Sequence, residues 1–151
     1  MEEAFDIEAL EVKWILGMIH THELPTVAVE LMTHGFDSES LLQLAVGDAT
    51  RVVESGSLFQ QALEELGRGK ISKLDALKHY AKTVSRRILN AEVSPLEGAR
   101  AIWHAQLSVG LSDFPGLDPF IYAASELEDR PEDSELFERM IRDEAGRWAS
   151  R

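Results

Sequence analysis

Three histidines and a glutamate near the N-terminus are the first residues whose chemistry suits a metal ion. His20, His22 and Glu23 stand almost together, and His34 follows. Zinc sites often take two ligands from one helical turn, three or four residues apart. His20 and His22 are two residues apart, which on a helix points them in different directions, and no second histidine completes a zinc-protease helix. The sequence therefore predicts an exposed turn here, with no bound metal and no cofactor.

A glycine-rich segment at residues 67–72 has some features of a phosphate-binding loop. Its glycines expose backbone N–H groups, and Lys70 adds a positive charge. A P-loop also needs a glycine five residues before Gly69 and a serine or threonine directly after the lysine. Glu64 and Ile71 occupy those two positions. We therefore interpret the segment as the end of a helix followed by a turn.

Ser112 lies in a sequence that is close to the nucleophile elbow of serine hydrolases. The motif begins at Gly110 but ends in Phe114 where a second glycine is required. No strand is predicted before it, so the strained strand-to-helix turn is missing. His104 is an isolated histidine that we expect at the surface or hydrogen-bonded in the core. The sequence predicts no catalytic residue.

A basic stripe runs along the middle of the chain. Lys78, Lys82 and Arg86 are four residues apart, so a helix places them on one face. Such a stripe can grip nucleic acid phosphates. The whole chain, however, carries 15 basic and 27 acidic residues, a net charge of −12 that repels nucleic acid and anionic lipid. We expect no binding to nucleic acid or membranes, and a solvated or internally paired basic face.

An acidic segment with aromatic residues just upstream is the best candidate for a partner contact. Residues 126–138 include seven acids in thirteen positions. Acids would steer a basic partner, and an aromatic side chain would supply desolvated contact area. The competing interpretation is that the acids are stabilised at a helix start and that the aromatics cover one end of the core. The candidate partner-binding residues are Phe114, Phe120, Glu128, Asp129, Glu132 and Asp133.

The elements that must position these residues are helices, because apolar residues recur at helical spacing and period-two alternation is missing. The strongest pattern is Leu74, Leu77, Ala81, Val84 and Ile88, spaced three, four, three and four residues apart. The sequence predicts an all-α fold, an irregular helical bundle of about seven or eight helices. Its length of 151 residues favours one compact domain over residues 1–151.

Turn residues and caps divide the helical pattern into segments. The first apolar stripe extends from Ile7 to Ile19, and Gly35 ends the second. Asp37 or Ser38 is expected to cap a short third helix. Breaks are predicted at residues 47–48 and 55–57, the latter with Ser57 capping a new helix. Further boundaries are predicted at the capping box of residues 94–97, the irregular segment 108–117, the start at residues 118–119 and the break at residues 130–131.

The composition and the charge distribution limit the classes to which the protein can belong. The apolar fraction is 44%, there is no cysteine, and the first residues lack the basic start and apolar stretch of a secretory leader. We therefore expect a soluble cytoplasmic protein of bacterial type. Residues 1–50 carry a net charge of −9, residues 51–100 of +3 and residues 101–151 of −6. The basic middle is expected to pack among acidic neighbours.

Two hypotheses for the function remain open. The first is a non-enzymatic interaction domain, for instance a small acidic inhibitor or immunity-type protein that binds a basic macromolecular partner. The alternative is a helical ligand-binding domain or an enzyme of unrecognised class. A protein partner is expected under the first hypothesis, and a homodimer is possible because an exposed apolar stripe needs cover.

Overall fold

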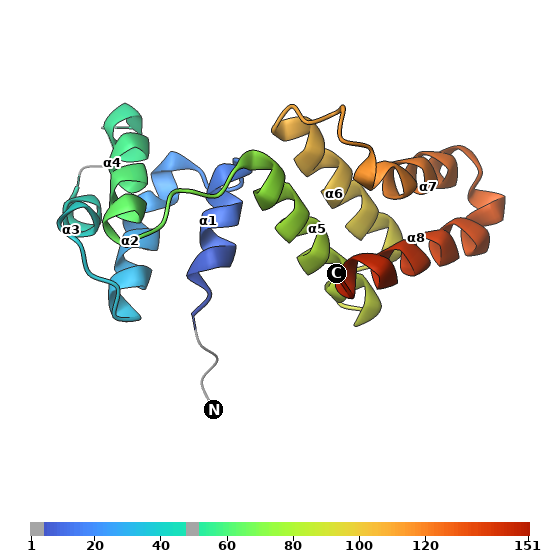
Figure 1. Cartoon of the computed structure of the whole chain (residues 1–151), viewed down its shortest axis with the longest axis horizontal. Coiled ribbons are helices and arrows are strands. Elements are labelled where there is room, and N and C mark those ends of the chain that lie inside the picture. The colour runs from blue at the N-terminus through green and yellow to red at the C-terminus, as the bar shows by residue number, and fades with distance from the viewer. Residues whose placement is uncertain (1–4, 48–51) are drawn as a thin grey trace. The chain divides into compact units, whose positions relative to one another are not determined.

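The computed structural model describes residues 5–47 and 52–151, the side chains of residues 52–54 excepted. All regular structure in these residues is helical, with eight α-helices and three short 3₁₀ turns. The predicted all-α class is therefore confirmed. The helices group into two compact units, residues 1–72 and 73–151 (Figure 1). The number of independently folding domains stays a prediction.

The first unit contains four α-helices and one 3₁₀ turn. Its helices are α1 (Ile7–Ile15), α2 (Leu24–Thr33), α3 (Glu39–Val46) and α4 (Val52–Glu65), with the turn at Thr21–Glu23 before α2. Helices α2, α3 and α4 pack on one another in sequence order. Ser38 caps α3, because its hydroxyl accepts a hydrogen bond of 3.0 Å from the backbone N–H of Leu41. The helix after the predicted stop at Gly35 thus begins at one of the two expected caps.

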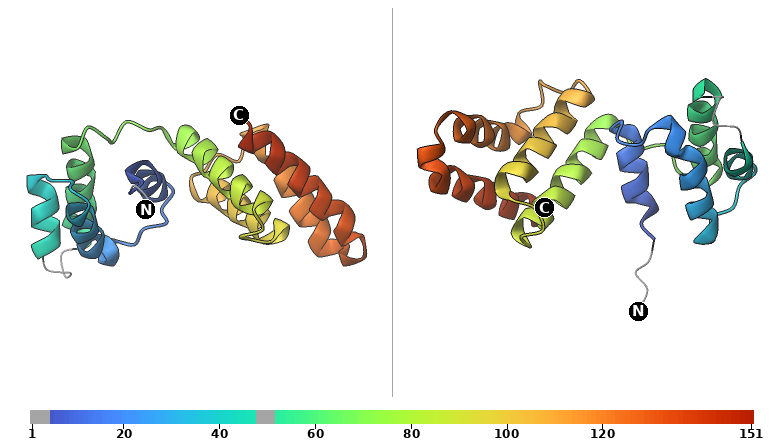
Figure 2. Two further views of the ribbon diagram at one scale, coloured as in Figure 1. Left: turned by 90° about the horizontal axis from the view of Figure 1, so that it is seen from below. Right: turned by 180° about the vertical axis from the view of Figure 1, so that it is seen from behind.

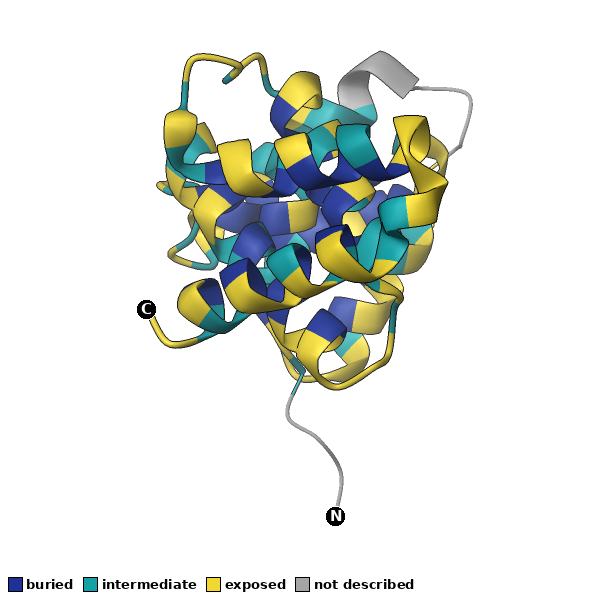
Figure 3. Ribbon diagram, turned by 90° about the vertical axis from the view of Figure 1, so that its right-hand side faces the viewer, coloured by how far each residue is buried: buried dark blue, intermediate teal, exposed yellow. Residues whose placement is uncertain are grey.

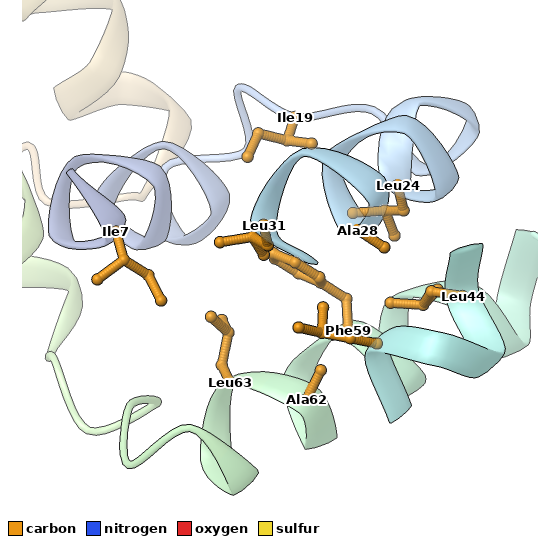
Figure 4. Close-up of a cluster of buried hydrophobic side chains, with 10 residues drawn as sticks. Ile7, Ile19, Leu24, Ala28, Leu31, Leu44, Phe59, Ala62 and Leu63 are labelled. Carbon is orange, nitrogen blue, oxygen red and sulfur yellow. The ribbon is translucent and has the colours of Figure 1, made fainter. Parts of the chain in front are cut away.

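The core of the first unit is a cluster of aliphatic side chains around Phe59 (Figure 4). Phe59 is completely buried, and the edge of the Trp14 ring meets it with ring centroids 5.0 Å apart. Leu24, Ala28 and Leu31 are the buried residues of α2, at the three- and four-residue spacing of one helix face. Helical periodicity therefore located this core correctly.

One predicted break in the first unit is wrong. The expected break at residues 55–57 does not occur, because α4 runs through Ser55, Gly56 and Ser57 without interruption. Gly56 faces α1, and a Cβ atom there would lie 3.6 Å from the Trp14 ring. The packing of α4 on its neighbours outweighs the weak helix propensity of these three residues. The predicted break at residues 47–48 is confirmed as far as it is described, because α3 ends at Val46 with Gly47 as its C-cap, and residue 48 lies outside the described residues.

Helix α1 is also shorter than the apolar stripe predicted. It ends at Ile15, and Gly17 adopts a φ of +74° that closes the helix. Met18 donates its backbone N–H back to the carbonyl oxygen of Lys13 at 2.9 Å. Ile19 therefore reaches the core from a loop and not from the helix.

The second unit contains the other four α-helices and two 3₁₀ turns, at Pro115–Leu117 and Pro131–Asp133. Its helices are α5 (Lys73–Leu89), α6 (Pro95–Ser108), α7 (Asp118–Asp129) and α8 (Ser134–Ala149). Helix α8 packs against both α5 and α7, and α6 packs against α5 and α7. Figure 2 shows α7 and α8 side by side, joined by the short turn at residues 130–133.

The core of the second unit follows the predicted stripes. Leu77, Ala81, Val84 and Ile88 of α5 are buried, and Phe137, Ile141, Ala145 and Trp148 supply the face of α8. Figure 3 shows the buried positions on the inner sides of the helices and the exposed positions on their outer sides. Ser94 caps α6 by accepting a hydrogen bond of 3.1 Å from the N–H of Glu97, as the capping box predicts.

Candidate functional site

The acidic segment spans the end of α7, the turn at residues 130–133 and the start of α8, and arginines neutralise only part of it. Arg130 pairs with Glu126 at 2.6 Å, and Arg100 pairs with Glu128 at 2.6 Å. Glu128, one of the predicted contact residues, is thus held in an ion pair with α6. The pairs are at the surface, where each contributes about 0–1 kcal/mol.

Four further carboxylates at this turn have no cation within 4.0 Å among the described residues. Three are predicted contact residues and the fourth is Glu135; we call the set Asp129, Glu132, Asp133 and Glu135 the acidic turn. Asp133 precedes the first residue of α8, and its side chain makes no capping hydrogen bond. Asp133 and Glu135 still lie where the exposed N–H groups of a helix start favour negative charge.

The two predicted aromatic contact residues have different positions. Phe120 is completely buried in the core of the second unit, so it offers no surface to a partner. Phe114 is half-buried and lies in the loop before α7. Because α7 has 12 residues, about 16 Å of helix separates its start from the acidic turn at its other end. The structure therefore does not bring Phe114 and the acids together.

A buried glutamine fixes the loop that carries Phe114. Gln106 of α6 is 2% exposed, and its Nε2 donates hydrogen bonds of 3.0 Å to the carbonyl oxygens of Leu111 and Phe114. Phe114 closes the loop by donating its own N–H to the Leu111 carbonyl at 3.0 Å. Sequence reasoning missed this role of Gln106. One sign of it was present in the sequence, because Gln106 stands four positions after Ile102 and a helix places this polar residue on the same buried face.

Phe114 forms one wall of a pocket in the second unit. The pocket has a volume of about 470 Å³. Helix α5, the Phe114 loop and the end of α8 supply its walls, and we call it the α5–α8 pocket. Its lining residues are Lys78, His79, Lys82, Phe114, Gly116, Trp148 and Arg151. Two members of the predicted basic stripe therefore face this pocket, and the third, Arg86, does not line it.

The cations of the pocket lie over its aromatic walls. The ammonium of Lys78 is 5.7 Å from the centre of the Phe114 ring, and the guanidinium of Arg151 is 4.3 Å from the Trp148 ring. These distances are within the range of cation–π attraction. Lys82 donates a hydrogen bond to the carbonyl oxygen of Arg151, which joins α5 to the end of α8. No carboxylate side chain lines the pocket.

The histidines do not assemble a ligand set. The rings of His20 and His22 stack with centroids 5.6 Å apart, and His34 stacks on Phe5 at 4.7 Å. Within residues 5–47 and 52–151, no three histidine or acidic side chains gather closely enough to hold a metal ion.

The remaining candidate segments are helix ends. Gly67 and Gly69 have φ values of +80° and +93°, and Arg68 donates its N–H to the Leu63 carbonyl at 2.7 Å, which terminates α4. Gly110 terminates α6 with a φ of +70°, and Ser112 follows a helix and not a strand. His104 is exposed on α6. These segments have the structural roles that the sequence predicted.

Comparison with known proteins does not assign the site. No protein-family model, curated protein or solved structure matches the chain. In the described part of the chain, no helix is both long and apolar enough to cross a membrane.

Proposed function

We propose that this protein is a non-enzymatic interaction domain that binds a basic macromolecular partner through the acidic turn. One observation carries the proposal. Arginines hold Glu126 and Glu128, whereas Asp129, Glu132, Asp133 and Glu135 have no cation within 4.0 Å among the described residues. Their charge is available to a partner.

Charge at this turn acts mainly on the rate of association. Complementary charges steer an incoming partner and raise the association rate, and salt weakens this steering. The net charge of −12 adds a long-range attraction for a basic partner. The turn is exposed, so its carboxylates stay hydrated until the partner arrives. The same residues that favour the start of α8 can therefore also serve as a docking surface.

The experiment compares two variants with the same change of net charge. The turn variant carries Asp129→Asn, Glu132→Gln and Asp133→Asn. The control variant carries Glu30→Gln, Asp37→Asn and Glu64→Gln, three exposed acids of the first unit. Each protein is used to capture partners from lysate of the source cells, and the association rate of any basic protein retained by the wild type is then measured across a salt series.

The proposal expects the wild type and the control to capture the same basic protein. The turn variant should associate several-fold more slowly and with a weaker salt dependence. Circular dichroism must show the same helix content in all three proteins. Equal association by the two variants would show that net charge alone acts, and would overturn the proposal. Failure of the wild type to retain any basic protein would also overturn it.

A further inference from the structure

We propose that the α5–α8 pocket binds a small organic anion with a flat apolar body and one carboxylate or phosphate group. This ligand site lies at the other end of α7 from the acidic turn and is independent of the partner contact proposed above. The walls of the pocket, its charge and its size all favour such a ligand.

The walls suit a flat apolar body. Phe114 and Trp148 are both aromatic and come from different elements, the loop before α7 and the end of α8. Trp148 is only 4% exposed and offers a ligand a small area, whereas Phe114 is more exposed and two hydrogen bonds from Gln106 hold its loop. Both walls are therefore largely pre-formed, which lowers the entropic cost of ordering them around a ligand.

The charge of the pocket selects an anion. Lys78, Lys82 and Arg151 line it, and no carboxylate side chain does, although acids outnumber bases in the chain by 27 to 15. The main-chain oxygen of Arg151 accepts a hydrogen bond from Lys82 and takes up part of its charge, so Lys78 and the Arg151 guanidinium are the cations left for a ligand. Lys82 is one helical turn from Lys78 and can still donate a hydrogen bond to the same acidic group, because an ammonium has three donors.

The size of the pocket points to a small molecule. A volume of about 470 Å³ is within the range of small-molecule sites. Sites of this kind combine apolar walls with a few polar groups that fix the orientation of the ligand. Here the aromatic walls would hold the body, and Lys78 and the Arg151 guanidinium would hold the acidic group with a hydrogen bond from Lys82.

The test uses two probes that have the same shape and differ in charge. Naphthalene-2-carboxylate is a flat aromatic anion, and naphthalene-2-carboxamide is its neutral counterpart. Binding of each to the full chain is measured by isothermal titration calorimetry at low and high salt. We expect the carboxylate to bind with a dissociation constant below about 1 mM and at least about tenfold more tightly than the amide. High salt should reduce this difference.

Matched lysine variants locate the binding site. The double variant Lys78→Gln/Lys82→Gln should weaken carboxylate binding about tenfold and leave amide binding unchanged. Arg86→Gln removes an exposed charge from the same helix outside the pocket, and it should bind like the wild type. Phe114→Ala should weaken both probes. Circular dichroism and melting temperature show whether each variant is folded.

Three outcomes would overturn the proposal. The first is that neither probe binds up to millimolar concentration. The second is that the carboxylate and the amide bind equally, which would make the site apolar without selection for charge. The third uses a short capped peptide with sequence Glu-Trp-Glu. If it binds at least about tenfold more tightly than the carboxylate, the occupant is an acidic protein segment and not a small anion.

Discussion

The side chain of Glu65, the last residue of α4, binds the first turn of α3 through Ser40. Its two carboxylate oxygens accept hydrogen bonds from Ser40, one from the backbone N–H at 3.1 Å and one from the hydroxyl at 2.7 Å. Ser40 is buried, so without Glu65 its hydroxyl and its N–H would lose these partners. These two hydrogen bonds also lower the pKa of Glu65 below its ordinary value of 4.5.

The first prediction concerns stability in acid. Because the folded state lowers the pKa of Glu65, its carboxylate stabilises the fold above pH 4.5, and this contribution is lost as the pH falls through the lowered pKa. Glu65→Gln should therefore destabilise the protein at pH 7 and flatten the loss of stability below pH 4.5. Urea unfolding at several pH values measures both effects. Glu64→Gln, at the neighbouring exposed acid, is the control. A steep acid dependence retained by Glu65→Gln would contradict this assignment.

The second prediction uses two glycines in helices of the second unit. A Cβ atom at Gly98 would lie 2.5 Å from two side-chain atoms of Ile88, whereas a Cβ at Gly146 meets nothing within 4 Å. Gly98→Ala should destabilise the fold by about 1–3 kcal/mol, because the packed side chain must move. Gly146→Ala should stabilise it by about 0.5–1 kcal/mol through helix propensity.

A double variant tests the cause at Gly98. Ile88→Ala removes both side-chain atoms that the new methyl group would contact, Cγ1 and Cδ1, so Gly98→Ala/Ile88→Ala should be more stable than the sum of the two single effects predicts. Thermal or urea unfolding gives the three values. If the two single changes in unfolding free energy simply add, the destabilisation by Gly98→Ala does not arise from contact with Ile88.

The third prediction separates the two aromatic residues that the sequence grouped together. Phe120 is completely buried, so Phe120→Ala should cost about 3–5 kcal/mol of unfolding free energy. Phe114 is half-buried at the pocket, and Phe114→Ala should cost less than about half as much, because less apolar area is lost. Equal losses in chemical unfolding would show that Phe114 is also a core residue.

The fourth prediction concerns Gln106 as a positioning residue. Gln106→Leu removes the donor of both hydrogen bonds to the Phe114 loop and leaves two carbonyl oxygens without it. The expected cost is about 1–3 kcal/mol. Amide hydrogen exchange at Phe114 should accelerate more than exchange in the middle of α5. Naphthalene-2-carboxylate should also bind more weakly. Protection at Phe114 that matches the wild type would mean that Gln106 does not fix the loop.

The fifth prediction concerns metal. His20 and His22 stack on each other and His34 stacks on Phe5, so no converging set of ligands is present among the described residues. Dialysis against a chelator should leave the melting temperature unchanged. A fall of several degrees that zinc reverses would require the histidines to be re-examined as ligands.

The sequence by itself determined the helical class and most of the helices of the second unit. The apolar spacing of Leu77, Ala81, Val84 and Ile88 needs only a helix to form one buried face. Ser94, Asp118 and Pro131 likewise marked real boundaries, because capping and proline chemistry act within one helical turn. A local sequence pattern is sufficient to locate a helix boundary when its cause, a cap or a proline, lies within one helical turn of it.

Only the tertiary structure decided which residues meet. Helix α4 continues through Gly56 because Trp14 packs there, and no property of residues 55–57 alone reports that contact. The complete burial of Phe120 depends on how α7 faces its neighbours, and the partial burial of Phe114 depends on where the loop before α7 packs. The α5–α8 pocket joins Lys78 to Trp148, residues far apart in the chain. Such contacts follow from the packing of several helices, which helical periodicity constrains but does not specify.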